Sequence, residues 1–336
     1  GVALRRVATE YGVFPKPVKA MRTVSASLGD EGNPLGEPRG KRAAWAEGLS
    51  VNEFSEGMEI LFFPCCYPSY DGRLKKVARA TAAILQKAGV EFGILGGKEN
   101  CCGESIRKTG DEAMFKRLAR ENIKAFVDNG VKKILVSSPH CYHTLKNEYA
   151  EFKVNFEVVH ISEFLFQLLR DKRLELSGAY AKKVTYHDPC YLGRHNGLFE
   201  EPREVLKGVP GLELVELPEC RAESLCCGGG GGRGWMETQK GERGSDLRIE
   251  QALGVGAEVL ATACPIWINP ASCKERRFSS ASAVFCSVIS RATPSKVTGY
   301  PALSYVKAAR FSIHNTVPFL CTHSIDRRMV TSFLAS

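Results

Sequence analysis

Several features that define other protein classes are missing from this sequence of 336 residues. No apolar run reaches the roughly 18 residues that a membrane-spanning helix needs. The first residues include Arg5 and Arg6, but the apolar core of a secretory signal does not follow them. No Cys-x-x-Cys pair occurs, although the chain holds 13 cysteines. Structural zinc sites prefer such pairs. These absences argue against a helical membrane protein, a secreted scaffold and a zinc ribbon.

The excess of positive charge is concentrated near one end of the chain. The formal net charge is +9, but residues 271–336 alone hold nine Lys or Arg against two acidic residues. The rest of the chain is close to neutral. It shows no basic helix and no aromatic platform of the kind that binds nucleic acid. We therefore expect no nucleic-acid partner.

The two ends of the chain are expected to lie outside the main body. Residues 1–57 are predicted to form helices over 4–11 and 18–28, followed by a linker that Trp45 anchors. Residue 1 is Gly rather than Met, which suggests a fragment or a processed chain. Residues 269–336 show no sustained period. We expect an irregular basic tail there, either disordered or translated from a shifted reading frame, because it begins inside a motif.

Between these ends, short apolar runs alternate with helical patterns. We predict strands over 59–63, 90–95, 133–137, 156–160, 184–187, 212–217 and 258–262, and helices over 73–87, 111–129, 163–169 and 244–253. Such alternation favours βαβ units and parallel sheets. The predicted fold class is therefore α/β, with two tandem Rossmann-like halves at residues 58–180 and 181–268.

Cysteine is the residue that the two halves repeat. A single cysteine precedes a Cys-Cys-Gly run, with 34 residues between them in the first half and 35 in the second. The matching landmarks are Cys66 and Cys190, then Cys101-Cys102-Gly103 and Cys226-Cys227-Gly228, then Ser138-Pro-His-Cys141 and Cys264-Pro-Ile-Trp267. Self-similarity at a fixed offset indicates an internal duplication.

Each cysteine site follows a predicted strand, at the edge where open parallel sheets bind their ligands. Thiolates are soft ligands that suit zinc, copper(I) and iron–sulfur clusters. Adjacent cysteines strain a mononuclear tetrahedral site. They suit a cluster better, because neighbouring sulfurs can bind different irons. Gly103 and Gly228 would let backbone N–H groups approach the cluster sulfur.

Both halves resemble the cysteine-rich CCG domain of the heterodisulfide reductase family. The same domain occurs in iron–sulfur subunits of glycolate oxidase, anaerobic glycerol-3-phosphate dehydrogenase and lactate-utilisation complexes. The family pattern is Cys, Cys-Cys-Gly and Cys-x-x-Cys, and the resemblance covers residues 58–267. It implies one or two [4Fe–4S] clusters that pass electrons, in some members a non-cubane cluster held by five cysteines. In the disulfide reductases one cluster also binds and cleaves the substrate disulfide.

Carried over by position, the resemblance implies a set of metal ligands in each half. Ser138 stands where the pattern has the first Cys of Cys-x-x-Cys, and Trp267 where it has the last. Each half therefore keeps four motif cysteines, which suffice for a cubane cluster. The implied ligands are Cys66, Cys101, Cys102 and Cys141 in the first half, and Cys190, Cys226, Cys227 and Cys264 in the second.

Other cysteines are not given a ligand role. Cys65 could replace Cys66, but the match between Cys66-Tyr67 and Cys190-Tyr191 favours Cys66. Cys220 is also a spare thiol. A fifth ligand in either half would require the Ser138 oxygen or a spare thiol. Cys273, Cys286 and Cys321 fit no pattern and are read as ordinary free thiols.

Three histidines, His140, His143 and His187, lie beside the predicted sites. A lone histidine is more often structural than catalytic. We assign His187 as a tentative proton donor, because Asp188 could orient it and disulfide reduction needs a proton source. The Gly228–Gly234 run contains a formal Gly-x-Gly-x-x-Gly. It follows a cysteine pair rather than a strand, so we expect a loop over the cluster and no dinucleotide site.

The sequence thus predicts an iron–sulfur oxidoreductase component, in the cytoplasm or at the cytoplasmic face of a membrane complex. The leading hypothesis is chemistry like that of heterodisulfide reductase, on a thiol or disulfide substrate. The alternative is a non-catalytic electron-transfer subunit of a flavin-dependent 2-hydroxy-acid or glycerol-3-phosphate dehydrogenase complex. A zinc-binding or metal-free scaffold is the third option.

The expected partners are a ferredoxin-type iron–sulfur module or subunit, and a flavoprotein or membrane quinone-reactive subunit. The stretch from Gly32 to Gly36, with Arg42 and Trp45, resembles the linker that follows a ferredoxin module in longer family members. The cysteines of that module are absent from this sequence, in agreement with a truncated N-terminus.

Overall fold

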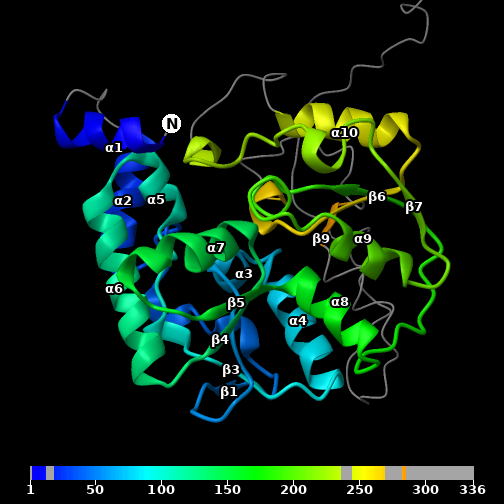
Figure 1. Cartoon of the computed structure of the whole chain (residues 1–336), viewed down its shortest axis with the longest axis horizontal. Helices are drawn as coiled ribbons and strands as arrows, with labels where there is room; N and C mark the ends of the chain where they lie inside the picture. The colour runs from blue at the N-terminus through cyan, green and yellow to red at the C-terminus, as the bar shows by residue number, and fades with distance from the viewer. Residues whose placement is uncertain (1, 13–18, 236–243, 269–281, 285–336) are drawn as a thin grey trace, which may run out of the picture. The chain divides into compact units, whose positions relative to one another are not determined.

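Two parallel β-sheets with flanking helices make up the part of the chain that the computed structural model describes, which is residues 2–12, 19–235, 244–268 and 282–284 (Figure 1). The chain divides into the units Gly1–Ser295 and Lys296–Ser336, and all the described residues belong to the first. The predicted α/β class is confirmed. The predicted tail lies outside the described residues except for one strand at 282–284.

The first sheet has five strands in the order β1-β3-β2-β4-β5, and every neighbouring pair is parallel. Its edge strand β1 comes from the segment predicted as a linker. The bounds are Asn52–Glu53 for β1, Ile60–Phe63 for β2, Phe92–Ile94 for β3, Lys133–Val136 for β4 and Glu157–His160 for β5. The central strand β2 is therefore flanked by β3 and β4.

The second sheet repeats this order as β7-β6-β8-β9, again with parallel pairs only. The bounds are Lys183–His187 for β6, Glu213–Val215 for β7, Val259–Thr262 for β8 and Ser282–Val284 for β9. The strands β6, β7, β8 and β9 take the places of β2, β3, β4 and β5. The duplication seen in the cysteine pattern is thus present in the topology. It extends to β9, to which the sequence analysis assigned no element.

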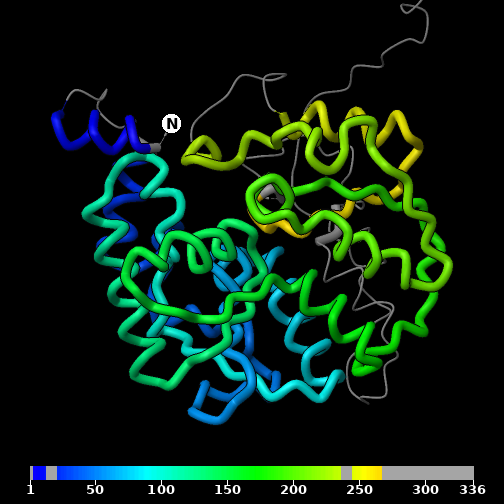
Figure 2. Tube along the Cα trace, viewed as in Figure 1, coloured from blue at the N-terminus to red at the C-terminus, as the bar shows by residue number. Residues whose placement is uncertain are grey.

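Helices connect the strands and cover the sheets. Helix α2 packs against α6, and α1 against α5, beside the first sheet (Figure 2). None of the described helices is long and apolar enough to cross a membrane. The bounds are Val2–Glu10 for α1, Lys19–Glu31 for α2, Cys66–Tyr70 for α3, Lys75–Lys87 for α4, Glu104–Thr109 for α5, Glu112–Asp128 for α6, Pro139–His143 for α7, Ile161–Arg170 for α8, Glu200–Lys207 for α9 and Gly244–Gly254 for α10.

The core forms because the central strands are apolar on both faces. All four residues of β2 are buried, as expected for a parallel strand that is covered on both sides. Phe62 packs edge-on against the buried Trp45, with ring centroids 5.6 Å apart. Phe63 packs in the same way against Phe126 of α6, at 6.2 Å. Trp45 is thus the anchor that the sequence predicted for the N-terminal segment.

The helices of nine or more residues were predicted, whereas the single-turn helices and the eight-residue α9 were not. The predicted helix over 111–129 is α6, which begins where the Asp111 carboxylate accepts a hydrogen bond from the N–H of Met114 at 2.9 Å. Helices α3, α5 and α7 have five or six residues each. An element of one turn is too short to show a 3.6-residue period, so no pattern indicated them.

A buried ion-pair network fixes the end of β6. Arg203 on α9 is fully buried and donates to both carboxylate oxygens of Asp188, at 2.7 and 2.8 Å. It also donates to Glu216 at 2.7 Å. Asp188 accepts a further hydrogen bond from the N–H of Arg221, at 2.8 Å. Because Asp188 follows β6 directly, the network holds the backbone that leads to Cys190.

We predict that Arg203→Leu lowers the free energy of unfolding by roughly 3–5 kcal/mol, because it leaves the Asp188 carboxylate buried without its partner. Lys207→Ala is the matched control, since it removes an exposed pair with Glu204 from the same helix. The control should change the free energy by less than about 1 kcal/mol. Urea denaturation measures both, and equal effects would contradict the importance of the network.

His160 gives a pH-dependent contribution to stability. The residue is fully buried at the end of β5, where its Nδ1 accepts the N–H of Ser162 and caps α8. Burial lowers the pKa of His160 to about 3. In the unfolded chain the pKa is about 6.5. Between these values the unfolded state binds a proton that the folded state does not, so stability decreases as the pH falls below about 6.5.

The variant His160→Asn keeps a capping side chain but cannot titrate. We expect its free energy of unfolding to depend less on pH than that of the wild type, by about 1.4 kcal/mol per pH unit between roughly pH 6 and pH 4. Urea denaturation at a series of pH values measures this slope. Parallel curves for the two proteins would show that His160 does not titrate on unfolding.

Candidate metal sites

The first cysteine cluster gathers at the carboxyl ends of three strands. Cys65 and Cys66 follow β2, Cys101 and Cys102 follow β3, and Cys141 lies on α7 after β4. All five side chains are buried and their thiols are free. The thiols form a hydrogen-bonded chain in the order Cys66, Cys101, Cys102, Cys141, Cys65. The structure thus brings together the four cysteines predicted for this half and adds Cys65.

Hydrogen bonds among the thiols set their proton affinities. The Cys101 and Cys141 thiols donate to Cys102 and lower its pKa to about 6. The hydrogen bond to Cys101 and burial raise the pKa of Cys66. One negative charge is therefore favoured near the middle of the chain of thiols. Metal binding would require the remaining thiols to lose their protons as well.

Two fixed donors point at the sulfurs of this cluster. The N–H of Gly103 lies 3.5 Å from the Cys101 sulfur. Gly103 has φ +85°, and a Cβ there would come within 2.8 Å of the Phe115 ring, so only glycine fits. The guanidinium of Arg42, fully buried, lies 3.6 Å from the Cys66 sulfur. These donors stabilise negative charge on sulfur.

The loop that carries Cys101 and Cys102 is held by residues that the sequence analysis did not select. Asn122 of α6 accepts the N–H of Asn100 at 2.8 Å and donates to the carbonyl of Cys101 at 3.2 Å. The Tyr149 hydroxyl donates to the carbonyl of Cys102 at 3.2 Å. A polar Asn122 within the apolar face of α6 was the only sequence signal for this arrangement.

The second cluster has the same construction but is more open. Cys190 follows β6, Cys226 and Cys227 follow β7, and Cys264 follows β8. The Cys226 thiol is hydrogen-bonded to those of Cys190 and Cys227. The fourth thiol, that of Cys264, is close enough to raise the pKa of Cys190 and of Cys227. Cys226 is exposed, Cys190 and Cys227 are half-buried, and Cys264 is buried. The four cysteines predicted for this half therefore come together.

A glycine again supports the cysteine pair. The N–H of Gly228 lies 3.4 Å from the Cys226 sulfur, and Gly228 has φ +78°. Position 267 lies in the 3-10 helix Pro265–Ile268 and offers no thiol. Cys220 lies beside Arg221, at 3.6 Å, and joins neither chain of thiols within the described residues. Cys273, Cys286 and Cys321 lie outside the described residues.

The donor sets fit a group with several metal atoms better than a single ion. Each set consists of sulfur atoms that include an adjacent pair, with a backbone N–H group beside the pair. Neighbouring thiolates on different irons, with N–H donors to sulfur, are features of iron–sulfur sites. The residues present therefore fit a cluster.

His140 connects the two clusters. Its Nδ1 lies 3.2 Å from the Glu104 carboxylate, and its side chain is hydrogen-bonded to the Cys264 thiol of the other half. Burial favours the neutral ring, but the Glu104 carboxylate and the interaction with Cys264 together outweigh it and raise the pKa of His140 to about 10. The ring of Tyr191 lies against it, with centroids 4.7 Å apart. A buried imidazolium therefore sits between the sulfur sets.

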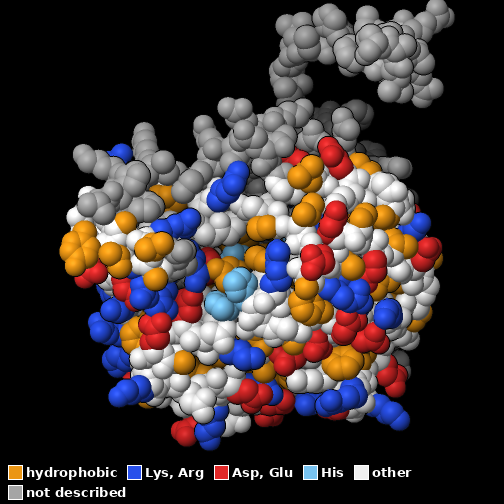
Figure 3. Space-filling model, turned by 45° about the horizontal axis from the view of Figure 1, so that its top comes forward, with side chains coloured by type: hydrophobic (Ala, Val, Ile, Leu, Met, Phe, Trp, Pro, Cys, Tyr) orange, Lys and Arg blue, Asp and Glu red, His pale blue; other side chains and the backbone are white. Residues whose placement is uncertain are grey.

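Two further histidines, nearer the surface, pack against the ring of the same tyrosine. The rings of His143 and His195 lie 4.9 and 4.8 Å from that of Tyr191. Figure 3 shows histidine side chains gathered near the middle of the face it presents. His143 is half-buried, and burial lowers its pKa. Among the described residues, no interaction joins His143 to a cysteine thiol.

His187 has a different environment from the one expected. Arg203 binds both carboxylate oxygens of Asp188, while the Nε of Arg248 donates to Nδ1 of His187 at 3.2 Å. Burial and the Arg248 charge lower the pKa of His187 to about 3. Arg248 thus holds Nδ1 of His187, and the orientation of His187 by Asp188 stays a prediction. The ring is neutral near pH 7, and its function as a proton donor stays a prediction.

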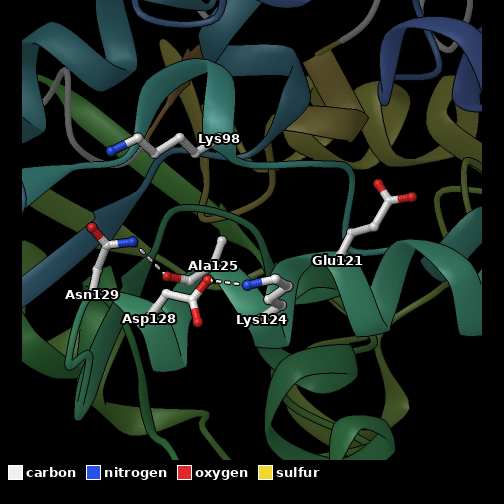
Figure 4. Close-up of a pocket in the computed structure, with 6 residues that line it drawn as sticks. All are labelled: Lys98, Glu121, Lys124, Ala125, Asp128 and Asn129. Carbon is white, nitrogen blue, oxygen red and sulfur yellow. Dashed lines mark hydrogen bonds and ion pairs between the residues drawn. The ribbon is translucent and has the colours of Figure 1, made fainter.

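A surface pocket on α6 is separate from the cysteine sets (Figure 4). Within it, Lys124 pairs with Asp128, and Asn129 donates to the carbonyl of Ala125 at 2.7 Å. The side chains that could bind a ligand are thus partly engaged with one another. The lining residues are Lys98, Glu121, Lys124, Ala125, Asp128 and Asn129. None of the six is a thiol or imidazole, so the pocket adds nothing to the metal sites.

Comparison with known proteins relates the chain to iron–sulfur oxidoreductases. It is 42% identical, over 79% of its length, to the "Probable iron-sulfur-binding oxidoreductase FadF" of Bacillus subtilis. It is 39% identical, over 70% of its length, to the "EtfAB:quinone oxidoreductase" of Syntrophomonas wolfei. It is 34% identical, over 76% of its length, to one subunit of the "Dihydromethanophenazine:CoB--CoM heterodisulfide reductase" of Methanosarcina acetivorans.

The chain spans only part of each relative's own length: 38% of the first, 35% of the second and 61% of the third. Among solved structures, a hypothetical protein from Helicobacter pylori matches 88% of this chain and 57% of its own, with a TM-score of 0.52 and 11% identity. That likeness supports the fold alone.

The model of the cysteine-rich domain, CCG, matches residues 60–146 and again residues 184–266. The first range contains β2, β3 and β4, the second contains β7, β8 and nearly all of β6, and together they hold both sets of thiols, while β1, β5 and β9 lie outside them. The chain therefore belongs to the family of proteins with the CCG cysteine-rich domain, and it holds two copies of that domain.

Proposed function

We propose that the two thiol sets hold iron–sulfur clusters and that the chain transfers electrons as part of an oxidoreductase. The observation that carries this proposal is the duplicated placement of cysteines. In each sheet, equivalent strands place the cysteines at the carboxyl edge, and a glycine N–H lies beside a cysteine sulfur there. The printed names of the FadF and heterodisulfide reductase relatives support the same class of function.

Each half is proposed to bind one [4Fe–4S] cluster, because four thiolates suffice for that type. Such a cluster, when bound, supplies one-electron transfer. The ligands are the eight cysteines of the family pattern, with Gly103 and Gly228 donating to sulfur. Arg42, whose charge is paired with the buried Glu99 carboxylate at 3.0 Å, would favour the more negative, reduced form of the first cluster mainly through its hydrogen bond to the Cys66 sulfur. The domain boundaries at residues 57, 180 and 268 are part of this proposal.

The leading candidate reaction resembles that of heterodisulfide reductase, with a thiol or disulfide substrate at the second site. Exposure favours that site, since Cys226 is exposed whereas every thiol of the first cluster is buried. His187 stays the proposed donor of the proton that a thiolate product needs, and because its ring is neutral near pH 7 it would first have to take up the proton that it passes on. The first cluster would then serve as an internal electron relay.

A second candidate is a non-catalytic relay in a flavin-dependent dehydrogenase complex. The observation in its favour is the name of the Syntrophomonas wolfei relative, EtfAB:quinone oxidoreductase. In either case the partners would be a ferredoxin-type iron–sulfur module, and a flavoprotein or quinone-reactive subunit. We propose a position in the cytoplasm or at the cytoplasmic face of a membrane.

We predict that Cys102→Ser and Cys227→Ser each remove about half of the bound iron, because each disables one of two independent sites. Cys220→Ser should leave the iron content unchanged, since its thiol joins neither set. Iron and acid-labile sulfide in anaerobically prepared protein provide the measurement. Loss of all iron from either single variant would contradict two separate sites.

A thiol titration distinguishes the two candidate functions. If the second site binds substrate, an added small thiol should change the electron paramagnetic resonance signal that the protein gives once its clusters are brought to a paramagnetic state by one-electron oxidation or reduction. The change should persist in Cys102→Ser and vanish in Cys227→Ser, because only the second site is open to solvent. An unaltered signal in the wild type would reject the thiol reaction and leave the relay.

A further inference from the structure

The first site contains a thiol that the family pattern does not include. Cys65 ends the segment that follows β2, and its backbone has φ +73°. Positive φ is uncommon for residues with a Cβ and costs no strain only for glycine. Among the described non-glycine residues, four have positive φ, and Cys65 is the only one of these that is buried. Cys65 therefore adopts a backbone conformation that favours glycine.

The surroundings hold the Cys65 thiol against the other cysteines. Its backbone carbonyl accepts hydrogen bonds from the Ser69 hydroxyl at 2.7 Å and from the Ser69 N–H at 3.2 Å. Its thiol is hydrogen-bonded to that of Cys141, which in turn bonds to Cys102. The side chain is 3% exposed. Cys65 is thus an integral member of the cluster of five thiols.

Ser138 occupies the position at which the sequence pattern calls for the missing cysteine. Its side chain is 2% exposed, and its hydroxyl has no hydrogen-bond partner within the described residues. It precedes α7 without capping that helix through its side chain. A buried hydroxyl without a partner is unfavourable. The hydroxyl stands three residues before Cys141, the cysteine that Cys65 contacts.

We propose that Cys65 supplies a fifth sulfur ligand to the first cluster, in place of the thiol that Ser138 lacks. This inference rests on the proposed function, since it requires that the first site binds a cluster. Among the described residues the second half shows no such substitute, because Pro189 takes the place of Cys65 and Trp267 that of the last cysteine. The two halves would therefore hold clusters with different ligand sets, five sulfurs in the first and four in the second.

The test uses three variants of the full chain: Cys65→Gly, Ser138→Cys and the double variant. Glycine suits the positive φ, so Cys65→Gly should fold. Circular dichroism and thermal unfolding of the metal-free proteins check this directly. A Cys220→Ser variant is the matched control for loss of a thiol outside both clusters.

Mössbauer spectroscopy of the cluster-loaded proteins provides the readout. We expect the wild type to show two unequal sets of iron signals. Cys65→Gly should lose or alter the set from the first site, and the double variant should restore it, because Ser138→Cys returns a sulfur to the pattern position. Cys220→Ser should match the wild type.

Two outcomes would overturn the inference, and they are distinguishable. A Cys65→Gly spectrum that superimposes on that of the wild type would show that Cys65 is not a ligand, while leaving the proposed function intact. A wild-type protein without iron or sulfide would overturn both the proposed function and this inference. A double variant that stays like Cys65→Gly would reject the exchange of roles between positions 65 and 138.

Discussion

The parallel pairing of β2 with β3 on one side and β4 on the other is the constraint on which the first cysteine site depends. Leu61 of β2 is in register with both Gly93 and Ile134, so three carboxyl ends converge. The second sheet repeats this, with Val184 in register with Leu214 and Val259. A slip of two residues in any of these pairs would move a thiol by about 7 Å. The apolar strands therefore matter to the chemistry because they set the register.

The two sites share a construction but differ in their surroundings. The first is buried and has the Arg42 charge beside its sulfur, whereas the second has an exposed cysteine. His140 joins them, since it pairs with Glu104 in one half and contacts Cys264 in the other. Under the proposed function, this arrangement suits an inner site that stores an electron and an outer site that meets a partner or substrate. The two halves share one backbone arrangement, and their different side chains make the two cysteine sites unequal.

The features that the sequence predicted are those that repeat along the chain or depend on neighbouring residues. The alternation of strands and helices, the duplication and the grouping of eight cysteines all followed from patterns along the chain. Contacts between distant residues did not. The sequence left Cys65 without a role because a positive φ cannot be seen in it, and the pairing of Asp188 with Arg203 depends on the packing of α9. Strand β9 was missed because three residues in a segment without a period carry no signal.

The central claim is that both halves bind iron–sulfur clusters. Iron and acid-labile sulfide per chain, measured on the full protein prepared without oxygen and accompanied by its visible spectrum, test it most directly. The account predicts a coloured protein with about eight irons and a similar amount of sulfide. A colourless protein, or one that contains zinc in place of iron, would contradict it.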